Sequence, residues 1–334
     1  MPSPAGPPDG TQLAQRLRDG DLTAAPAVLN LVENRAPAAR RPIADLLRGV
    51  SPAELGGEAG GHVVGVTGPP GAGKSTLLSQ LVREWRSREC SVAVLAVDPS
   101  SRRSGGSLLG DRARIAFDPH DRGTFIRSTA AGDRLGGLAA ATRAAAHALA
   151  AAFDIVVIET VGVGQSETEI AEVADTVAVI VQPGSGDALQ FLKSGIMEIP
   201  DVLVVTKADL GDIAMRARRD LNAALRSAGS RDTKVVAVSS VSTPPIGMAD
   251  LVDALADHRG TLDLPQRRLA SRRASALADF TAEHGERGIR ALGGRRAARR
   301  FLQELAPGDD IPSIVQALEH RATDAGAEPP HSPV

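Results

Sequence analysis

The feature that most constrains this chain is a glycine-rich segment that separates a short apolar run from a helical pattern. The segment, of the form GxxxxGKS, reads Gly68-Pro69-Pro70-Gly71-Ala72-Gly73-Lys74-Ser75. It follows the run His62–Thr67 and precedes the stretch 74–88, and this order of strand, turn and helix is what a phosphate-binding loop (P-loop) requires. Backbone N–H groups and the positive end of the helix dipole then attract phosphate oxygens. The segment predicts a nucleoside triphosphate site, and a simple connecting turn is the less favoured interpretation.

Magnesium is expected beside the phosphates, because the hydroxyl of Ser75 is placed to ligate it while Lys74 reaches the β- and γ-phosphates and Thr76 the α-phosphate. The ion needs further oxygen ligands, usually through waters held by carboxylates. The candidates are Asp98, Asp111 and Glu159, each of which ends a strand or lies in the loop after one. The two aspartates could instead stabilise a turn or helix end. Glu159 follows four apolar residues, where an unpartnered carboxylate is costly.

A second phosphate-sensing segment follows Glu159 in the run Glu159-Thr160-Val161-Gly162. It is a variant of the Asp-x-x-Gly pattern, in which the glycine amide bonds the γ-phosphate and is released on hydrolysis. Gln165 either orients the attacking water or caps the next helix. Lys74, Glu159 and Gln165 are therefore the candidate catalytic residues.

The base is predicted to be guanine. The strand at 202–206 ends in Thr206-Lys207-Ala208-Asp209, where many GTPases carry Asn-Lys-x-Asp. The aspartate accepts two hydrogen bonds from the guanine ring N–H and amine, a pair that adenine does not offer. Thr206 stands where the asparagine would brace the loop, and a hydroxyl can do part of that work. The next strand ends in Ser239-Ser240-Val241, from which a backbone N–H is expected to contact guanine O6.

Alternating strand and helix patterns predict an α/β fold, a P-loop NTPase with a mostly parallel central sheet covered on both faces. The predicted strands are His62–Thr67, 92–97, Ile155–Glu159, Thr176–Val181, 202–206 and 234–238, and the predicted helices include 74–88, 135–152 and 213–229. We expect disordered tails at 1–10 and 326–334, an N-terminal helical region at 11–60, the P-loop domain at 61–265 and a C-terminal helical arm at 266–325.

Composition restricts the remaining possibilities. The net charge is −2, so nucleic acid and anionic membrane are not expected partners. The single cysteine, Cys90, excludes an internal disulfide and is interpreted as a core residue rather than a reactive thiol. Without a recognisable signal peptide or an apolar run long enough for a membrane span, a cytoplasmic location is expected.

Several of these segments together resemble the MeaB/ArgK family of P-loop GTPases. The resemblance rests on Val97-Asp98-Pro99-Ser100-Ser101, on 104–111, on Glu159-Thr160-Val161-Gly162-Val163-Gly164-Gln165-Ser166-Glu167, and on Gly186-Asp187-Ala188-Leu189-Gln190 continuing through Lys193 to 195–199. It covers about residues 40–265 strongly and the helical ends loosely.

The resemblance implies a GTP-binding and GTP-hydrolysing chaperone that protects and reloads an adenosylcobalamin-dependent acyl-CoA mutase such as methylmalonyl-CoA mutase. It implies a homodimer formed by the C-terminal helices, and a third switch at 182–193 in which Asp187, Gln190 and Lys193 act. Phe191, Leu192 and Ser194 depart from the family pattern, consistent with a different mutase partner; a helix-capping Asp187 and a solvated Lys193 are the alternative. No cobalamin site of the chain's own is evident.

Three other functions are weaker interpretations. A nickel-type metallochaperone needs soft or imidazole ligands, yet the seven histidines are scattered and no Cys-x-x-Cys occurs. A kinase acting on a transport protein needs a base that activates an acceptor, and none is evident. A nucleotide-gated scaffold with negligible hydrolysis also fits. Because no arginine finger is identifiable, turnover without a partner is expected to be slow.

Overall fold

The computed structural model describes residues 8–98, 115–130, 138–160, 165–184, 200–230 and 232–327. The chain forms two compact units. One runs from Gly60 to Leu264, and the other combines the residues up to Ala59 with those from Pro265 onward.

The larger unit is built on a parallel sheet whose strand order is β3-β2-β4-β1-β5-β6-β7. The strands are β1 His62–Thr67, β2 Val92–Asp98, β3 Thr124–Ala130, β4 Ile155–Glu159, β5 Thr176–Val181, β6 Val202–Val205 and β7 Lys234–Ala237. The α/β prediction is confirmed, and the strand that precedes the glycine segment lies between β4 and β5, near the middle of the sheet.

Strand β3 was not predicted. It pairs only with β2 at the edge of the sheet, and its sequence mixes Phe125 and Ile126 with polar residues such as Thr124 and Arg127. An edge strand of this kind lacks the continuous apolar run of a strand buried on both faces, so the pattern that identified the other strands did not apply. The predicted helix at 135–152 is also shorter, since α6 spans Ala140–Leu149 and residues 150–152 form a hydrogen-bonded turn at its end.

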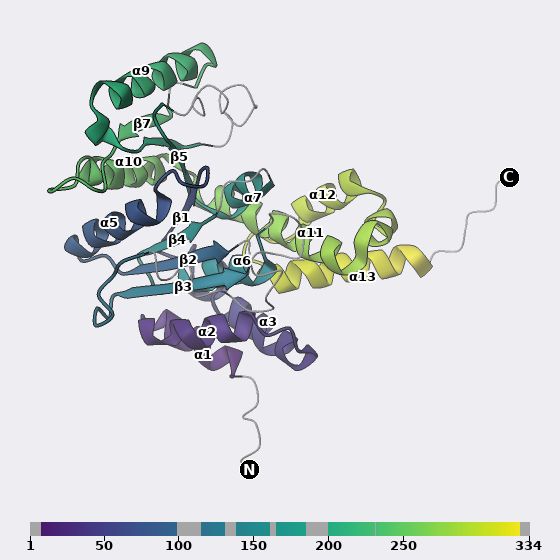
Figure 1. Cartoon of the computed structure of the whole chain (residues 1–334). Helices are drawn as coiled ribbons and strands as arrows, with labels where there is room; N and C mark the ends of the chain where they lie inside the picture. Colours follow the sequence, from purple (N-terminus) through teal and green to yellow (C-terminus); the bar gives the residue numbers. More distant parts are fainter. Residues whose placement is uncertain are drawn as a thin grey trace. The chain divides into compact units, whose positions relative to one another are not determined.

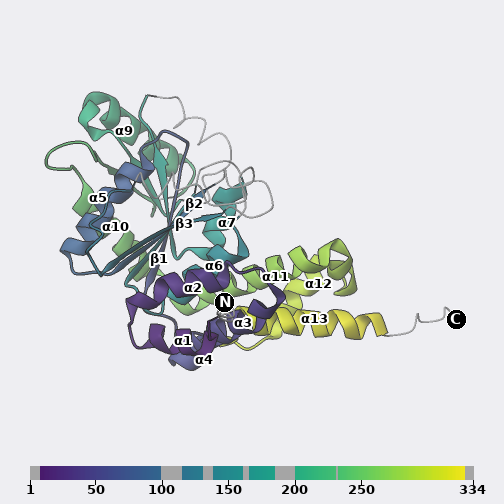
Figure 2. The ribbon, with the colours of Figure 1, turned by 60° about the horizontal axis from the view of Figure 1, so that its bottom comes forward.

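Helices cover both faces of the sheet, and alternate residues of each strand face opposite layers. Helices α5 (Lys74–Ser87) and α10 (Met248–Thr261) pack together and share a core with Val64 and Val66 of β1 (Figures 1 and 2). On the other face, a Cβ added at Gly65 would come within 2.7 Å of Ile170 in α7 (Gln165–Val173). Glycine at this position lets α7 approach β1 closely. Helix α9 (Asp212–Ser227) connects β6 to β7.

The smaller unit is helical and has a core of its own. Its elements are α1 Gly10–Arg18, η1 Leu22–Ala24, α2 Ala25–Val32, η2 Pro37–Ala39, α3 Arg40–Gly49, α4 Pro52–Leu55, α11 Leu264–Ala291, α12 Arg295–Glu304 and α13 Ile311–Ala327. Phe280, Leu302 and Leu318 belong to a buried cluster contributed by the last three helices. Arg272 is buried too, and it makes two hydrogen bonds of 2.8 and 2.9 Å to the carboxylate of Glu58.

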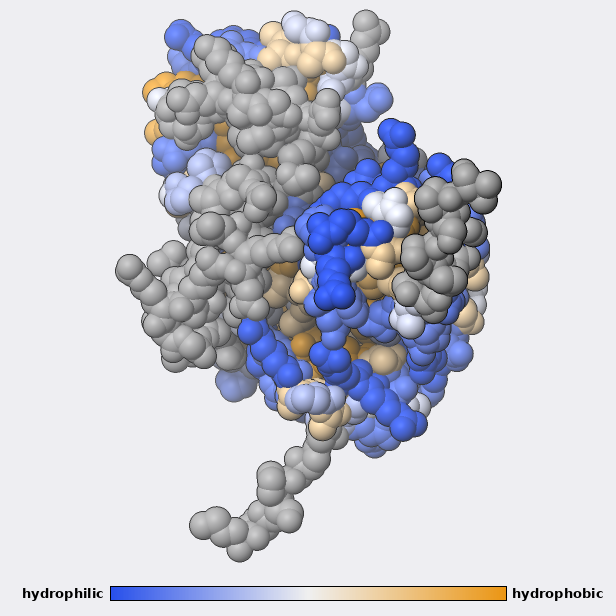
Figure 3. All heavy atoms as spheres, turned by 90° about the vertical axis from the view of Figure 1, so that its right-hand side faces the viewer, coloured by the Kyte–Doolittle hydropathy of each residue, from blue (hydrophilic) through white to orange (hydrophobic). Residues whose placement is uncertain are grey.

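Hydrophilic side chains cover most of the described surface in the view of Figure 3, and apolar residues form small patches between them. None of the described helices combines the length and the hydrophobicity that crossing a bilayer requires.

A pair of side chains joins the end of α5 to the loop before β3. Arg86 donates to both carboxylate oxygens of Asp121, at 2.7 and 2.9 Å, and to the carbonyl of Cys90 at 2.8 Å. Asp121 also accepts from the Gly123 N–H at 3.0 Å and the Thr124 hydroxyl at 2.7 Å. These hydrogen bonds, led by that of Arg86, hold the pKa of the Asp121 carboxyl well below its usual range.

We predict that Asp121→Asn lowers the free energy of unfolding of this unit by about 1–3 kcal/mol at pH 7, the usual value for hydrogen bonds to charged groups. A carboxyl whose pKa is depressed on folding stabilises the protein above its unfolded pKa, about 3.9, and loses that contribution as the pH falls below it. The difference between wild type and variant is therefore full at pH 5–7 and shrinks below about pH 4. Urea unfolding followed by the fluorescence of Trp85, the sole tryptophan, measures it.

The control is Asp118→Asn, since the Asp118 side chain is exposed and accepts only from the nearby His120 N–H among the described contacts. A difference between wild type and Asp121→Asn that stays constant from pH 7 to pH 3.5 would contradict the linkage.

Candidate nucleotide-binding site

The glycine segment leaves β1 in a conformation that favours glycine at three positions, of which Gly71 has φ +78°. Gly68 has φ +150°, and an added Cβ would lie 2.6 Å from the carbonyl oxygen of Ile180 in β5. Gly73 has φ +91° and is the N-cap residue of α5, so no capping side chain covers the first N–H groups of the helix. Left-handed φ values favour glycine. The first N–H groups of α5 are therefore presented at the carboxyl edge of the sheet, as an anion-binding helix end requires.

Lys74 folds back over this loop. Its ammonium donates to the carbonyls of Gly68, at 2.7 Å, and Pro69, at 3.1 Å, and the residue is only 7% exposed. A buried ammonium is held in place by such bonds. The charge is thereby fixed inside the loop, where it can interact with the outer phosphates of a nucleotide.

Thr206 connects the loop to the end of β6. Its buried hydroxyl lies 3.0 Å from the Ala72 carbonyl and 3.4 Å from the Val181 carbonyl, and its backbone N–H donates to Val181 at 3.0 Å. The shorter contact makes Ala72 the main acceptor. A threonine hydroxyl thus braces the phosphate loop from the strand that leads to Asp209.

The two segments proposed to hold the base are joined by hydrogen bonds. Asp209 accepts from the Ser239 hydroxyl at 2.5 Å, and Ser239 accepts in turn from Ser242 at 2.8 Å. The Ala208 N–H donates to the Val238 carbonyl at 2.9 Å. Just before them, Lys207 adopts a left-handed conformation with φ 56°. These contacts hold the Asp209 carboxylate beside the 239–241 segment.

The sheet places two of the magnesium candidates near the loop. Glu159 is 6% exposed at the end of β4, paired with Val66 of β1, and Ser75 lies in the first turn of α5. Nearby, the buried hydroxyls of Thr67 and Thr160 have no hydrogen-bond partner among the described residues. A hydroxyl, a carboxylate and buried polar atoms at one edge are a donor set that suits Mg²⁺ and its waters.

Other predicted site residues are not described or only partly described. Asp98 ends β2, two residues beyond the position paired with Glu159, but its side chain is not described. Gln165 begins α7, also without a described side chain. Outside the described residues lie Asp111, Gly162, Asp187, Gln190 and Lys193.

Two residues of this region were not predicted from the sequence. Gln80, on α5, donates to the Ser240 carbonyl at 3.1 Å, and Ser242 supports Ser239. The Gln80 contact joins two segments that are 160 residues apart, and Ser242 lies just beyond the predicted 239–241 run, so no motif signals either residue. Cys90 fits its structural interpretation, because it packs against the core and burial raises the pKa of its thiol.

Comparison with known proteins agrees with this geometry. A family model described as "Methylmalonyl Co-A mutase-associated GTPase MeaB" matches residues 25–287. A protein of Pyrococcus abyssi described as a GTPase is 42% identical over 270 residues, covering 78% of this chain and 80% of its own length. The mouse protein named methylmalonic aciduria type A homolog, mitochondrial, is 44% identical over 157 residues, covering 47% of this chain and 38% of its own.

Among solved structures, the crystal structure of an LAO/AO transport system kinase is similar with a TM-score of 0.63 and 26% identity, covering 93% of this chain and 96% of the other.

We predict that Thr206→Val weakens GTP and GDP binding about 3- to 10-fold, because the Ala72 carbonyl loses its donor and the brace on the loop is removed. Thr206→Ser keeps the hydroxyl and is expected to bind nearly as the wild type does. Isothermal titration calorimetry with both variants measures the difference. Equal affinities for wild type and Thr206→Val would mean that the hydroxyl does not support the loop.

Proposed function

This chain belongs to the MeaB family of GTPases, and we propose that it binds and hydrolyses GTP and uses its nucleotide state to control a partner, an adenosylcobalamin-dependent acyl-CoA mutase. The observation that carries the proposal is the hydrogen bond between Asp209 and Ser239, at 2.5 Å. It holds a carboxylate next to the backbone of 239–241 at the carboxyl edge of a P-loop sheet. A carboxylate that can accept two hydrogen bonds complements the ring N–H and the amine of guanine, and the backbone N–H groups beside it complement O6.

The phosphate end would be served by the loop and its lysine. Lys74 neutralises the outer phosphates, while Ser75, with Glu159 acting through water, would hold Mg²⁺. When bound, the ion would offset the negative charge that develops on the phosphates during hydrolysis. We also propose Asp98 and Asp111 for the metal site. Gly162 would sense the γ-phosphate, and Gln165 would position the attacking water. We expect slow turnover by the protein alone, since no arginine finger is identifiable in the sequence.

The mutase partner is proposed from the family description and from the mouse relative, whose name refers to methylmalonic aciduria. In this proposal Asp187, Gln190 and Lys193 report the nucleotide state to the mutase, and the helices after Gln266 form a homodimer. The chain would act as a chaperone that gates loading of the cofactor, with the cobalamin held by the mutase.

We predict that Asp209→Asn weakens GTP binding about 10- to 100-fold, as expected for the loss of two hydrogen bonds to a charged acceptor. The amide can instead donate to the 2-carbonyl of xanthine, so xanthosine triphosphate should bind the variant better than GTP does. Competition calorimetry with both nucleotides checks this exchange. The matched control is Lys74→Ala, which should lose both nucleotides; an Asp209→Asn variant that still prefers GTP would refute the base assignment.

For the partner, we predict a complex with an adenosylcobalamin-dependent acyl-CoA mutase whose stability differs between GDP and a non-hydrolysable GTP analogue. Size-exclusion chromatography with purified methylmalonyl-CoA mutase, and with its relatives acting on isobutyryl-, 2-hydroxyisobutyryl- and ethylmalonyl-CoA, tests it. Cofactor transfer to the mutase apoenzyme should depend on the nucleotide. Failure of all four enzymes to bind in any nucleotide state would count against the mutase role.

A further inference from the structure

The base segment is closed into a small loop by its own backbone. The N–H of Ser239 donates to the Ile246 carbonyl, and the N–H of Ile246 donates to the Ser239 carbonyl, both at 3.0 Å. The side chain of Val241, within this loop, is 72% exposed and so is not fixed by packing. Hydrogen bonds to the backbone of Ser240 are therefore the contacts that orient the 240–241 peptide.

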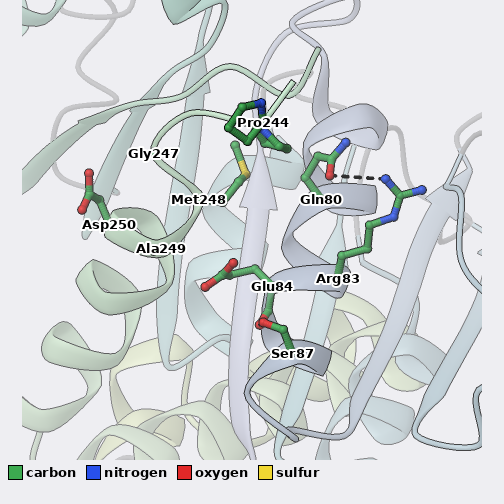
Figure 4. Close-up of a pocket in the computed structure, with 10 residues that line it drawn as sticks. Gln80, Arg83, Glu84, Ser87, Pro244, Gly247, Met248, Ala249 and Asp250 are labelled. Atoms are coloured by element: carbon green, nitrogen blue, oxygen red, sulfur yellow. Dashed lines mark hydrogen bonds between the residues drawn. The ribbon is translucent and has the colours of Figure 1, made fainter. Parts of the chain in front are cut away.

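One side chain from another element makes such a bond. Gln80 lies on α5, six residues after Lys74, and its amide donates to the Ser240 carbonyl at 3.1 Å. Its own oxygen accepts from Arg83 at 3.4 Å (Figure 4). Helix α5 thus touches the nucleotide site twice, with its first turn at the phosphate loop and with Gln80 at the base segment.

Peptide geometry gives this contact a consequence for the base. In a planar trans peptide the carbonyl and the following N–H point in opposite directions, and the cis bond described in this segment is Thr243–Pro244, not Ser240–Val241. Fixing the Ser240 carbonyl on α5 therefore directs the Val241 N–H away from α5. In the same way, the hydrogen bond from the Ile246 N–H to the Ser239 carbonyl directs the Ser240 N–H away from Ile246.

The Val241 N–H has no hydrogen-bond acceptor within the described part of the chain. We propose that Gln80 is a positioning residue for guanine selectivity: it holds the Ser240–Val241 peptide so that its N–H donates to guanine O6. This inference rests on the proposed guanine site. Gln80 touches neither the base nor the phosphates in this role, and it acts through one peptide plane.

The surroundings of Gln80 offer space for substitution. A cavity of about 480 Å³ lies beside it, lined among others by Arg83, Ser87, Pro244 and Met248 (Figure 4). Gln80 itself is half-buried, so shortening it removes a hydrogen bond without opening a void in the core. Substitutions here should change the peptide orientation and leave the fold intact.

The test compares Gln80→Ala and Gln80→Glu with the wild type, using three triphosphates. GTP and inosine triphosphate both carry O6, whereas 2-aminopurine riboside triphosphate lacks it. Glutamate keeps the length of glutamine but presents only acceptors to the Ser240 carbonyl. We expect both variants to bind GTP and inosine triphosphate about 3- to 10-fold more weakly, as for one lost hydrogen bond, and 2-aminopurine riboside triphosphate as the wild type does.

The control is Ser87→Ala. Ser87 lines the same cavity, and among the described contacts its hydroxyl donates only to the Glu84 carbonyl within α5. The nucleotide affinities of this variant should equal those of the wild type. Trp85 fluorescence during urea unfolding checks that each variant folds. Unchanged GTP affinity in Gln80→Ala, or an equal loss for the nucleotide without O6, would overturn the assignment. A wild type that binds no GTP would instead overturn the guanine site itself.

Discussion

The nucleotide site depends on the close approach of two neighbouring strands where β1 ends. At Gly68 the backbone passes so near the Ile180 carbonyl of β5 that a Cβ would lie 2.6 Å from it, and the loop then turns into α5. The hydroxyl of Thr206, at the end of β6, reaches the same loop through the Ala72 carbonyl. A parallel sheet brings these strand ends to one edge, so contacts between neighbouring strands shape the glycine-rich loop.

Helix α5 extends this organisation toward the base. Its first turn presents N–H groups and holds Lys74 over the loop, and Gln80 bonds the segment that follows β7. In the same segment, the hydroxyl of Ser239 donates to Asp209. The proposed phosphate and base ends of the site are therefore connected through one helix and through two strand ends, which favours preorganisation for binding.

Much of this was predictable because it rests on local patterns. Unbroken Val and Ile runs identified six of the strands, and the spacing of glycine and lysine identified the loop. Strand β3 was missed because an edge strand tolerates polar residues, and Gln80 and Ser242 were missed because their partners are distant in sequence or follow no motif. The pairing of Arg272 with Glu58, which lies more than 200 residues earlier in the chain, follows no local pattern either. Long-range pairs of this kind become visible only once the chain is folded.

The account depends on guanine being the base, and the affinity of the unmodified protein for GTP and for ATP tests this most directly. Titration calorimetry with each nucleotide and Mg²⁺ should give GTP binding at least about 100-fold tighter than ATP binding, because adenine offers Asp209 no pair of hydrogen-bond donors. Equal affinities for GTP and ATP would contradict the account, even if both nucleotides bound tightly to the phosphate loop.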